Sequence, residues 1–331
     1  MLKSLQGYHP RQMIWIIFLS ILSWMPAFVR PDLFPLRCVF SPAPFEGLFR
    51  SLQHLPVTAT TLLFFAVFLI SGYLLVILNN QYLFLKSRTF LPLFFLASLT
   101  SPVLGLAAMS DLAFTVPLFL GAIFLAFRTY RNNRIDLSYF PAALWVGIAS
   151  LFSIKAIFFL PILWIALITL RPFYPREWLV SLLGFLTPWY LYLATAYLFG
   201  LDPATILNRL ILPGLTAQWS PFSPDRFQHF MAGYLALLIL VTSFHGLYAL
   251  SGMKIRSRKF HMIFFWNAVV AVILMIIHKE DPGAVFPYLA LSLSLLFSLF
   301  FSGERITRLK SVLFNLYLAG FLGLLIARII L

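Results

Sequence analysis

Charged side chains are scarce in this chain, and acidic ones are the scarcest. Asp, Glu, Lys and Arg make up 10% of its 331 residues, with 10 acids against 24 basic residues. A soluble domain carries roughly 25% charged residues, so the composition excludes an ordinary soluble protein. Hydrophobic residues make up 61% of the chain, and 37 of them are Phe. These proportions predict a multi-pass membrane protein whose Phe and Trp side chains face the lipid bilayer and its interfaces.

Cysteine is almost absent, which limits the chemistry further. Cys38 is the one cysteine, so an intrachain disulfide is excluded. The sequence has no Cys or His spacing typical of zinc, no P-loop and no Ser–His–Asp order, and we predict no specific metal site. The net charge of +14 comes from short basic clusters between apolar segments. This pattern is typical of loops at an anionic membrane surface and does not indicate a nucleic-acid partner.

The spacing of apolar runs and charges predicts an all-α fold, a polytopic transmembrane helix bundle of about 11 spans. We expect one integral membrane domain, residues 1–331, with its N-terminus in the cytoplasm. The predicted spans are residues 12–29, 56–78, 89–108, 112–127, 139–154, 156–170, 178–199, 229–250, 261–278, 284–302 and 311–330.

One charge decides how the middle of the chain is divided. Residues 139–170 form an apolar stretch of 32 residues whose only charge is Lys155. A single helix needs about 20 apolar residues to cross a bilayer, so this stretch predicts two short helices with Lys155 at the apex of a hairpin. Asp111 is predicted at the apex of the preceding hairpin. Both charges are therefore expected on the same side of the membrane.

Counts of Lys and Arg predict which side that is. With the N-terminus inside, 16 of the 24 basic residues lie in inner segments, whereas seven of the 10 acids lie in outer ones. Splitting residues 139–170 into two spans is what keeps this alternation. Residues 30–55 and 200–228 form two long outer loops. Their Pro, Trp and Phe content favours segments that fold back onto the membrane.

Two acids on the predicted outer face are candidates for catalysis. Asp32 closely follows the first span, where a carboxylate can deprotonate a sugar hydroxyl or bind a divalent cation that bridges a phosphate. It can equally be an ordinary loop acid beside Arg30. Asp111 precedes a helix that starts near Leu112, so it can orient a polar head group or a metal. Alternatively, Asp111 or Ser110 caps that helix.

Several cations on the same face are candidates for substrate binding. Lys155 can contact a phosphate, since an ammonium needs no special geometry, or it can be an anchor that extends to the interface. Lys279 lies in the turn 278–283, which can bind a cation or a phosphate or can be a salt-bridged turn. Arg209 can contact a phosphate or anchor its loop. The sequence leaves each pair of alternatives open.

The layout resembles the polytopic glycosyltransferases of the GT-C superfold. The matching residues are Arg30-Pro31-Asp32, Ser110-Asp111-Leu112, the basic turn 128–134 and the segment 145–161 around Lys155. Such enzymes use polyprenyl-phosphate-linked sugars at the outer face. The resemblance implies that Asp32 is the catalytic base or a metal ligand, that Asp111 is a second polar contact, and that Lys155 holds the lipid phosphate. It also leaves a divalent cation open as cofactor.

The same stretch is also similar to a bacterial family of multi-pass inner-membrane proteins that has no established activity. This second resemblance includes the segments 170–173, 176–179 and 186–189. Together the two resemblances cover roughly residues 12–200, and we take these residues as a GT-C-like core. Residues 201–331 add an outer loop and further spans. The bacterial resemblance implies the cytoplasmic (inner) membrane as the location.

Three functions follow from these observations. The first is a glycosyltransferase-like enzyme that moves a sugar from a polyprenyl-phosphate donor, with Asp32 and Asp111 as catalytic residues and Lys155, Arg30, Lys279 and Arg209 as substrate-binding residues. The second is a non-catalytic membrane subunit of an envelope assembly or secretion complex, with membrane proteins as partners. The third is a transporter, which ranks last because nearly every charge falls at the end of a span.

Overall fold

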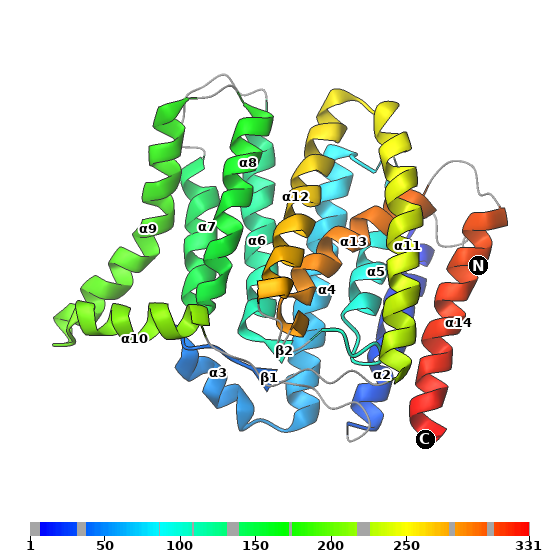
Figure 1. Ribbon diagram of the computed structural model, residues 1–331, viewed down its shortest axis with the longest axis horizontal. Coiled ribbons are helices and arrows are strands. Elements are labelled where there is room, and N and C mark those ends of the chain that lie inside the picture. The colour runs from blue at the N-terminus through cyan, green and yellow to red at the C-terminus, as the bar shows by residue number, and fades with distance from the viewer. Residues whose placement is uncertain are drawn as a thin grey trace.

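The computed structural model describes residues 7–31, 38–85, 87–107, 109–130, 139–171, 174–216, 226–277, 282–302 and 308–330. In these residues the chain is all-α apart from one pair of two-residue strands (Figure 1). The elements are α2 (Pro10–Val29), β1 (Cys38–Val39), α3 (Glu46–Gln53), α4 (Val57–Tyr82), α5 (Leu91–Leu99), β2 (Met109–Ser110), α6 (Asp111–Arg128), α7 (Tyr139–Phe152), η1 (Ile154–Phe159), α8 (Leu160–Leu170), α9 (Pro175–Leu198), α10 (Pro203–Thr216), α11 (Arg226–Ser251), α12 (Ile255–Ile277), η2 (Pro282–Ala284), α13 (Phe286–Phe301) and α14 (Arg308–Ile330).

Length and composition divide the helices into two groups. Five of the described helices, α2, α4, α6, α9 and α12, are long and apolar enough to cross a membrane. Four shorter apolar helical segments join them, at Tyr139–Phe152, Ile154–Leu170, Ala232–Gly246 and Phe286–Phe301. Most of these helices run side by side (Figure 1). The predicted all-α bundle is thereby confirmed, whereas the number of spans and their orientation stay predictions.

The long apolar stretch around Lys155 is broken where the charge predicts a break. Helix α7 ends at Phe152, and Ser153 has an extended backbone, with φ −144° and ψ 118°. The 3-10 helix η1 carries Lys155, and α8 begins at Leu160. Because α7 and α8 contact each other directly, the two helices pack as a pair on either side of this break.

The expected span at residues 89–108 is different. Helix α5 has nine residues, all of them buried, and after Thr100 the chain continues to residue 107 as turns and irregular backbone. Nine residues extend about 14 Å, which is too short to cross a bilayer. The half-helix packs against α4 and α13, and the indole N–H of Trp24 donates a hydrogen bond to the Ala97 carbonyl at 2.9 Å. Irregular backbone at membrane depth needs such protein partners, so the prediction of a full span was wrong.

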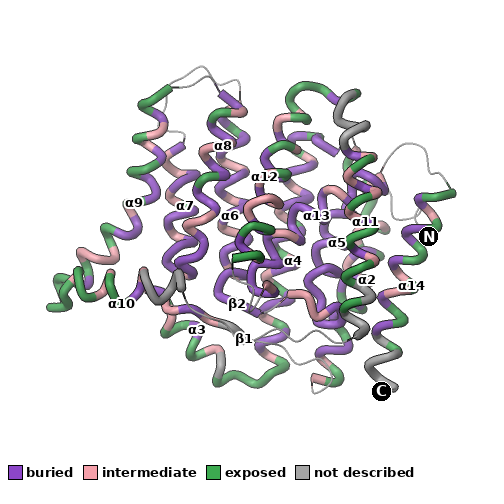
Figure 2. Tube along the Cα trace, viewed as in Figure 1, coloured by how far each residue is buried: buried purple, intermediate pink, exposed green. Residues whose placement is uncertain are grey.

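Many Phe side chains lie inside the bundle, although we expected them to face lipid. Phe95 is completely buried, and its ring centroid lies 5.5 Å from Phe301 and 5.6 Å from Phe297. Buried residues fill the centre of the bundle around α5 and α13, whereas exposed residues are frequent on α9 and α10 (Figure 2). The interior and the lipid are similarly apolar, so composition alone does not separate the two surfaces.

Close contact between two backbones joins α7 to α9. A Cβ atom added at Gly147 would lie 2.5 Å from the Phe185 carbonyl oxygen, and one added at Gly184 would lie 2.5 Å from the Phe140 carbonyl oxygen. Small residues permit this approach in membrane helices, where lipid gives little hydrophobic drive for helices to associate. The indole N–H of Trp189 also donates a hydrogen bond to Ser150 Oγ, at 2.7 Å, across the same pair of helices.

Both long loops predicted on the outer face contain a helix, α3 in the first and α10 in the second. Helix α10 lies across the ends of the upright helices, at the lower edge of Figure 1. Asp202 precedes it and accepts hydrogen bonds from the hydroxyl of Thr205, at 2.6 Å, and from its N–H, at 3.0 Å. These bonds hold the pKa of Asp202 below its usual range. The second loop is therefore organised around a capped helix.

Candidate functional site

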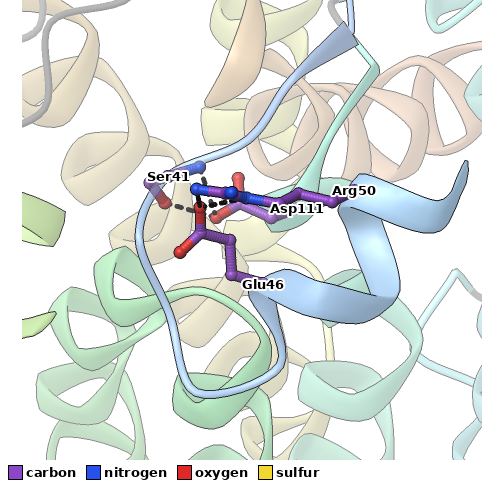
Figure 3. Close-up of polar contacts among 4 residues, drawn as sticks. All are labelled: Ser41, Glu46, Arg50 and Asp111. Atoms are coloured by element: carbon purple, nitrogen blue, oxygen red, sulfur yellow. Dashed lines mark hydrogen bonds and ion pairs between the residues drawn. The ribbon is translucent and has the colours of Figure 1, made fainter. Parts of the chain in front are cut away.

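Asp111 is the first residue of α6, and its side chain is completely buried. Ser110 caps the helix, since its Oγ accepts a hydrogen bond from the Ala113 N–H at 3.3 Å. The Asp111 carboxylate therefore does not cap the helix, and it binds a residue of another segment. Its Oδ2 atom accepts from the hydroxyl of Ser41, in a short hydrogen bond, and from the Ser41 N–H at 3.4 Å (Figure 3). Of the two predicted caps, Ser110 is the one observed.

The first long loop, residues 30–55, reaches Asp111 through backbone pairing. Strand β1 pairs with β2 in parallel, with Cys38 opposite Met109 and Val39 opposite Ser110. This register places Ser41 two residues beyond the pairing, beside the start of α6. Farther along the loop, the Phe45 N–H donates a hydrogen bond to the carbonyl of Leu151, near the end of α7, at 3.2 Å. The loop is therefore fastened to both α6 and α7.

Aromatic rings in tilted and edge-to-face contact close the same junction. Phe49 of α3 is completely buried, and its ring centroid lies 5.2 Å from Phe114 of α6 and 6.2 Å from Phe152 of α7. Also on α3, Glu46 and Arg50 form an ion pair at 2.6 Å, one helical turn apart (Figure 3). The apolar face of α3 thus covers the site, and its charged face points outward.

Lys155 joins this cluster from η1. Its side chain is 1% exposed, and its positive charge acts on the Asp111 carboxylate. The Ser153 hydroxyl also lies beside that carboxylate. A buried ammonium is costly unless an opposite charge or polar groups compensate it. The expectation that Lys155 and Asp111 lie on the same side of the bundle is confirmed, and the two charges interact.

Two polar atoms of the cluster lack a hydrogen-bond partner in the described part of the chain. They are Oδ1 of Asp111 and Oγ of Ser153, and both are buried. Buried polar atoms are nearly always paired, so an unpaired carboxylate oxygen needs an explanation. The Ser153 hydroxyl lies beside the carboxylate and is itself a donor from which this oxygen can accept. The cluster therefore combines a carboxylate held by Ser41, a neighbouring serine hydroxyl and a nearby cation.

Residues from the end of the chain complete the support beneath Asp111. The Ser110 hydroxyl donates to the carbonyl of Ala284, in η2, at 3.1 Å. One turn along α6, the Thr115 hydroxyl lies 2.6 Å from the Tyr288 hydroxyl. The Tyr288 ring in turn stacks on Phe159 of η1, with centroids 3.6 Å apart. Tyr288 thus links α6 and the Lys155 segment through one side chain.

The other residues predicted for the site divide into two groups. Arg30 and Arg209 are exposed, and within the described residues neither is seen in contact with Asp111 or Lys155. Helix α10, which carries Arg209, does pack against η1. Asp32 and Lys279 lie outside the described residues.

Sequence reasoning missed Ser41, Ser153 and Tyr288. Ser41 and Ser153 are small polar residues in non-helical segments, and they belong to no motif that distinguishes them from other serines. Tyr288 lies in the predicted span 284–302, for which the sequence indicated no functional residue. In the described residues there is no group of three His, Cys, Asp or Glu side chains. One carboxylate beside an ammonium does not fit a divalent cation.

Comparisons with protein-family models, curated proteins and solved structures give no match. The class of protein therefore rests on the chain itself. Five long apolar helices, further short ones and an interior built from apolar side chains define a multi-pass integral membrane protein. Its apolar helices place it in contact with the lipid bilayer.

Proposed function

We propose that this protein is a membrane enzyme of the GT-C-like glycosyltransferase kind, which acts on a polyprenyl-phosphate-linked sugar. The observation that carries the proposal is the meeting of Asp111, Ser41 and Lys155 from three separate segments. Two of these residues, Asp111 and Lys155, are among those that the resemblance implies for a head-group site. The bacterial cytoplasmic membrane, with the site at the outer face, is the location that goes with this proposal.

The proposed reaction is a simple substitution at the sugar. An acceptor hydroxyl attacks the anomeric carbon, the bond from that carbon to the phosphate oxygen breaks, and the polyprenyl phosphate leaves with the bonding electrons. A carboxylate takes the hydroxyl proton. We assign that role to Asp32 and assign the orientation of a sugar hydroxyl to Oδ1 of Asp111. Lys155 stabilises the charge that grows on the phosphate.

Arg30, Lys279 and Arg209 are the remaining proposed substrate contacts. Each carries a permanent positive charge, as a phosphate ligand requires. The exposed position of Arg209, on the helix that packs against η1, suits contact with a ligand that approaches from the aqueous side.

A second function is supported by the burial of the cluster. Asp111, Ser41 and Lys155 are each 1% exposed or less. Such a closed cluster also suits a non-catalytic subunit, in which the buried charges fix the arrangement of helices and the exposed surfaces bind partner proteins. In that case the charges define the fold and perform no reaction.

Conservative variants separate the two functions. Asp111→Asn and Lys155→Met keep the side-chain size, and Asp32→Asn tests the proposed base independently. Glu46→Gln is the matched control, since it removes a carboxylate from the outer edge of the same site. The measurements are the level of inserted protein, its thermal unfolding midpoint, and the cellular glycans and lipid-linked sugars.

Loss of a glycan in Asp32→Asn, with normal insertion and stability, supports the enzyme, as does the same loss in Asp111→Asn or Lys155→Met. Unchanged glycans in well-inserted variants contradict it. Co-purification of a fixed partner in mild detergent, lost in the same variants, supports the subunit instead.

A further inference from the structure

A second polar site lies at the opposite end of α6 from Asp111. A cavity of about 850 Å³ opens there, lined by the ends of α4 and α6 and the start of α12. Its lining includes Arg128, Lys254 and Arg256, together with Tyr82 and Tyr130. The sequence marks these basic residues as part of the charge asymmetry between the two faces, and Arg128 also as the start of the basic turn 128–134.

Among the described residues, no carboxylate lies beside the cations of this cavity. The lining contains no acid, and in the described residues the two ion pairs are Arg50–Glu46 and Arg171–Glu177. All three cations are exposed at the end of the bundle where the cavity opens, namely Arg128, Lys254 and Arg256. Three positive charges gathered without a counter-charge repel one another, and an anion between them removes that repulsion.

Aromatic side chains hold one of these cations in place. The Arg256 guanidinium lies 5.0 Å from the centroid of the Tyr82 ring and 5.8 Å from that of Tyr130. Contact with the faces of these rings leaves the N–H edges of a guanidinium able to donate hydrogen bonds. The side chain is thus ordered in advance of any ligand, which lowers the entropy cost of binding.

A hydroxyl without a hydrogen-bond partner in the described residues also indicates that this cavity binds an anion. Tyr82 is 7% exposed, and its hydroxyl is buried without a hydrogen-bond partner in the part of the chain that the structure describes. The charges of Arg256 and Arg128 both act on this hydroxyl. A phenol that lies among guanidinium groups is a donor suited to an anionic oxygen.

The position of the cavity indicates which anions reach it. Helix α6 has 18 residues and extends about 27 Å, close to the thickness of the hydrocarbon core of a bilayer. Asp111 and Arg128 therefore lie near opposite boundaries of the membrane when α6 crosses it. Phosphate groups are concentrated at this level, both in lipid head groups and in soluble phosphates at the surface.

We propose that this cavity is a phosphate-binding site, in which Arg128, Lys254 and Arg256 bind a phosphate group and Tyr82 donates a hydrogen bond to it. The phosphate belongs either to an anionic lipid head group or to a soluble phosphate. The site is distinct from the Asp111 cluster and does not depend on the function proposed for that cluster.

The experiment uses the purified full-length protein in two arms. In neutral detergent, equilibrium dialysis measures the binding of radiolabelled inorganic phosphate. In nanodiscs of phosphatidylcholine with a minority of phosphatidylglycerol, native mass spectrometry measures the retained anionic lipid. The variants are Arg256→Gln, Lys254→Gln and Tyr82→Phe. Arg258→Gln is the matched control, because it removes an exposed charge from the same turn of α12 outside the cavity.

We expect each lost cation to weaken binding about tenfold or more, and the lost hydroxyl to weaken it several-fold. Arg258→Gln is expected to bind like the parent protein. An effect in the dialysis arm identifies a soluble phosphate, and an effect in the nanodisc arm alone identifies a lipid head group. Equal binding by the cavity variants and Arg258→Gln in both arms overturns the proposal. Lys254→Gln is the variant least prone to misfold, since Lys254 is exposed and lies outside any helix.

Discussion

The close approach of α7 and α9 permits a quantitative test of how the bundle is held together. In Gly184→Ala, the new methyl group would lie 2.5 Å from the Phe140 carbonyl oxygen and 3.2 Å from Ala143 Cβ. In Gly147→Ala it would lie 2.5 Å from the Phe185 carbonyl oxygen. In both variants the new methyl group clashes with a backbone carbonyl oxygen, so the clash is removed only if the two helices move apart.

Overpacking of this kind costs about 1–3 kcal/mol, whereas replacement of Gly by Ala inside a helix gains about 0.5–1 kcal/mol. We therefore expect each variant to lower the free energy of unfolding by about 1–2 kcal/mol. The double variant is expected to cost less than the sum, because one separation of the helices relieves both clashes. Gly233→Ala is the control, since nothing lies within 4 Å of its added Cβ.

The assay is unfolding of the purified protein in mixed detergent micelles with increasing denaturing detergent, followed by circular dichroism. Gly233→Ala should be as stable as the parent protein or slightly more stable. If Gly147→Ala and Gly184→Ala match Gly233→Ala, the two backbones do not approach as closely as described and the reasoning fails.

Two further predictions concern charges. Arg171 and Glu177 form an ion pair whose side chains are 4% and 2% exposed. Glu177→Gln should therefore lower the free energy of unfolding by about 3 kcal/mol, since it removes a buried negative charge that pairs with Arg171. In the same assay, Glu46→Gln at the exposed pair should cost about 0.5 kcal/mol or less, and equal costs would contradict this. The second prediction concerns orientation in the membrane and uses Arg209→Cys and Arg258→Cys, each in a chain whose native cysteine has been replaced. A membrane-impermeant maleimide should label position 209 in intact cells and position 258 only after permeabilisation. The reverse labelling pattern would show that the predicted topology is inverted.

Strong single signals in the sequence were enough to predict part of this fold. Lys155 interrupts an apolar stretch too long for one helix, and the structure breaks the helix at that point. The same reasoning placed Lys155 and Asp111 at one end of the bundle. Both predictions rest on the high cost of a charge in an apolar setting, and this cost is a local property that can be read from one residue and its neighbours.

Other features depend on contacts that leave no local trace. The partner of Asp111 is Ser41, 70 residues earlier, and nothing in the sequence around Ser41 distinguishes it. The short helix α5 is supported by Trp24 of α2, which donates a hydrogen bond to the Ala97 carbonyl. A hydropathy profile shows the apolar run at this place, but it does not show that the helix ends early. The roles of Asp32 and Lys279 stay predictions, since these residues lie outside the described part of the chain.

The hydrogen bonds beneath Asp111 also impose an order on biosynthesis. The ribosome synthesises Ser110 and Thr115 more than 170 residues before it reaches their partners, Ala284 and Tyr288. While α6 enters the membrane, neither hydroxyl has its native partner, and Phe159 lacks the ring on which it stacks. The cluster around Asp111 and Lys155 therefore reaches its final form only after α13 has been inserted. Any activity at this end of the bundle must therefore begin after the segment that carries Ala284 and Tyr288 has been inserted.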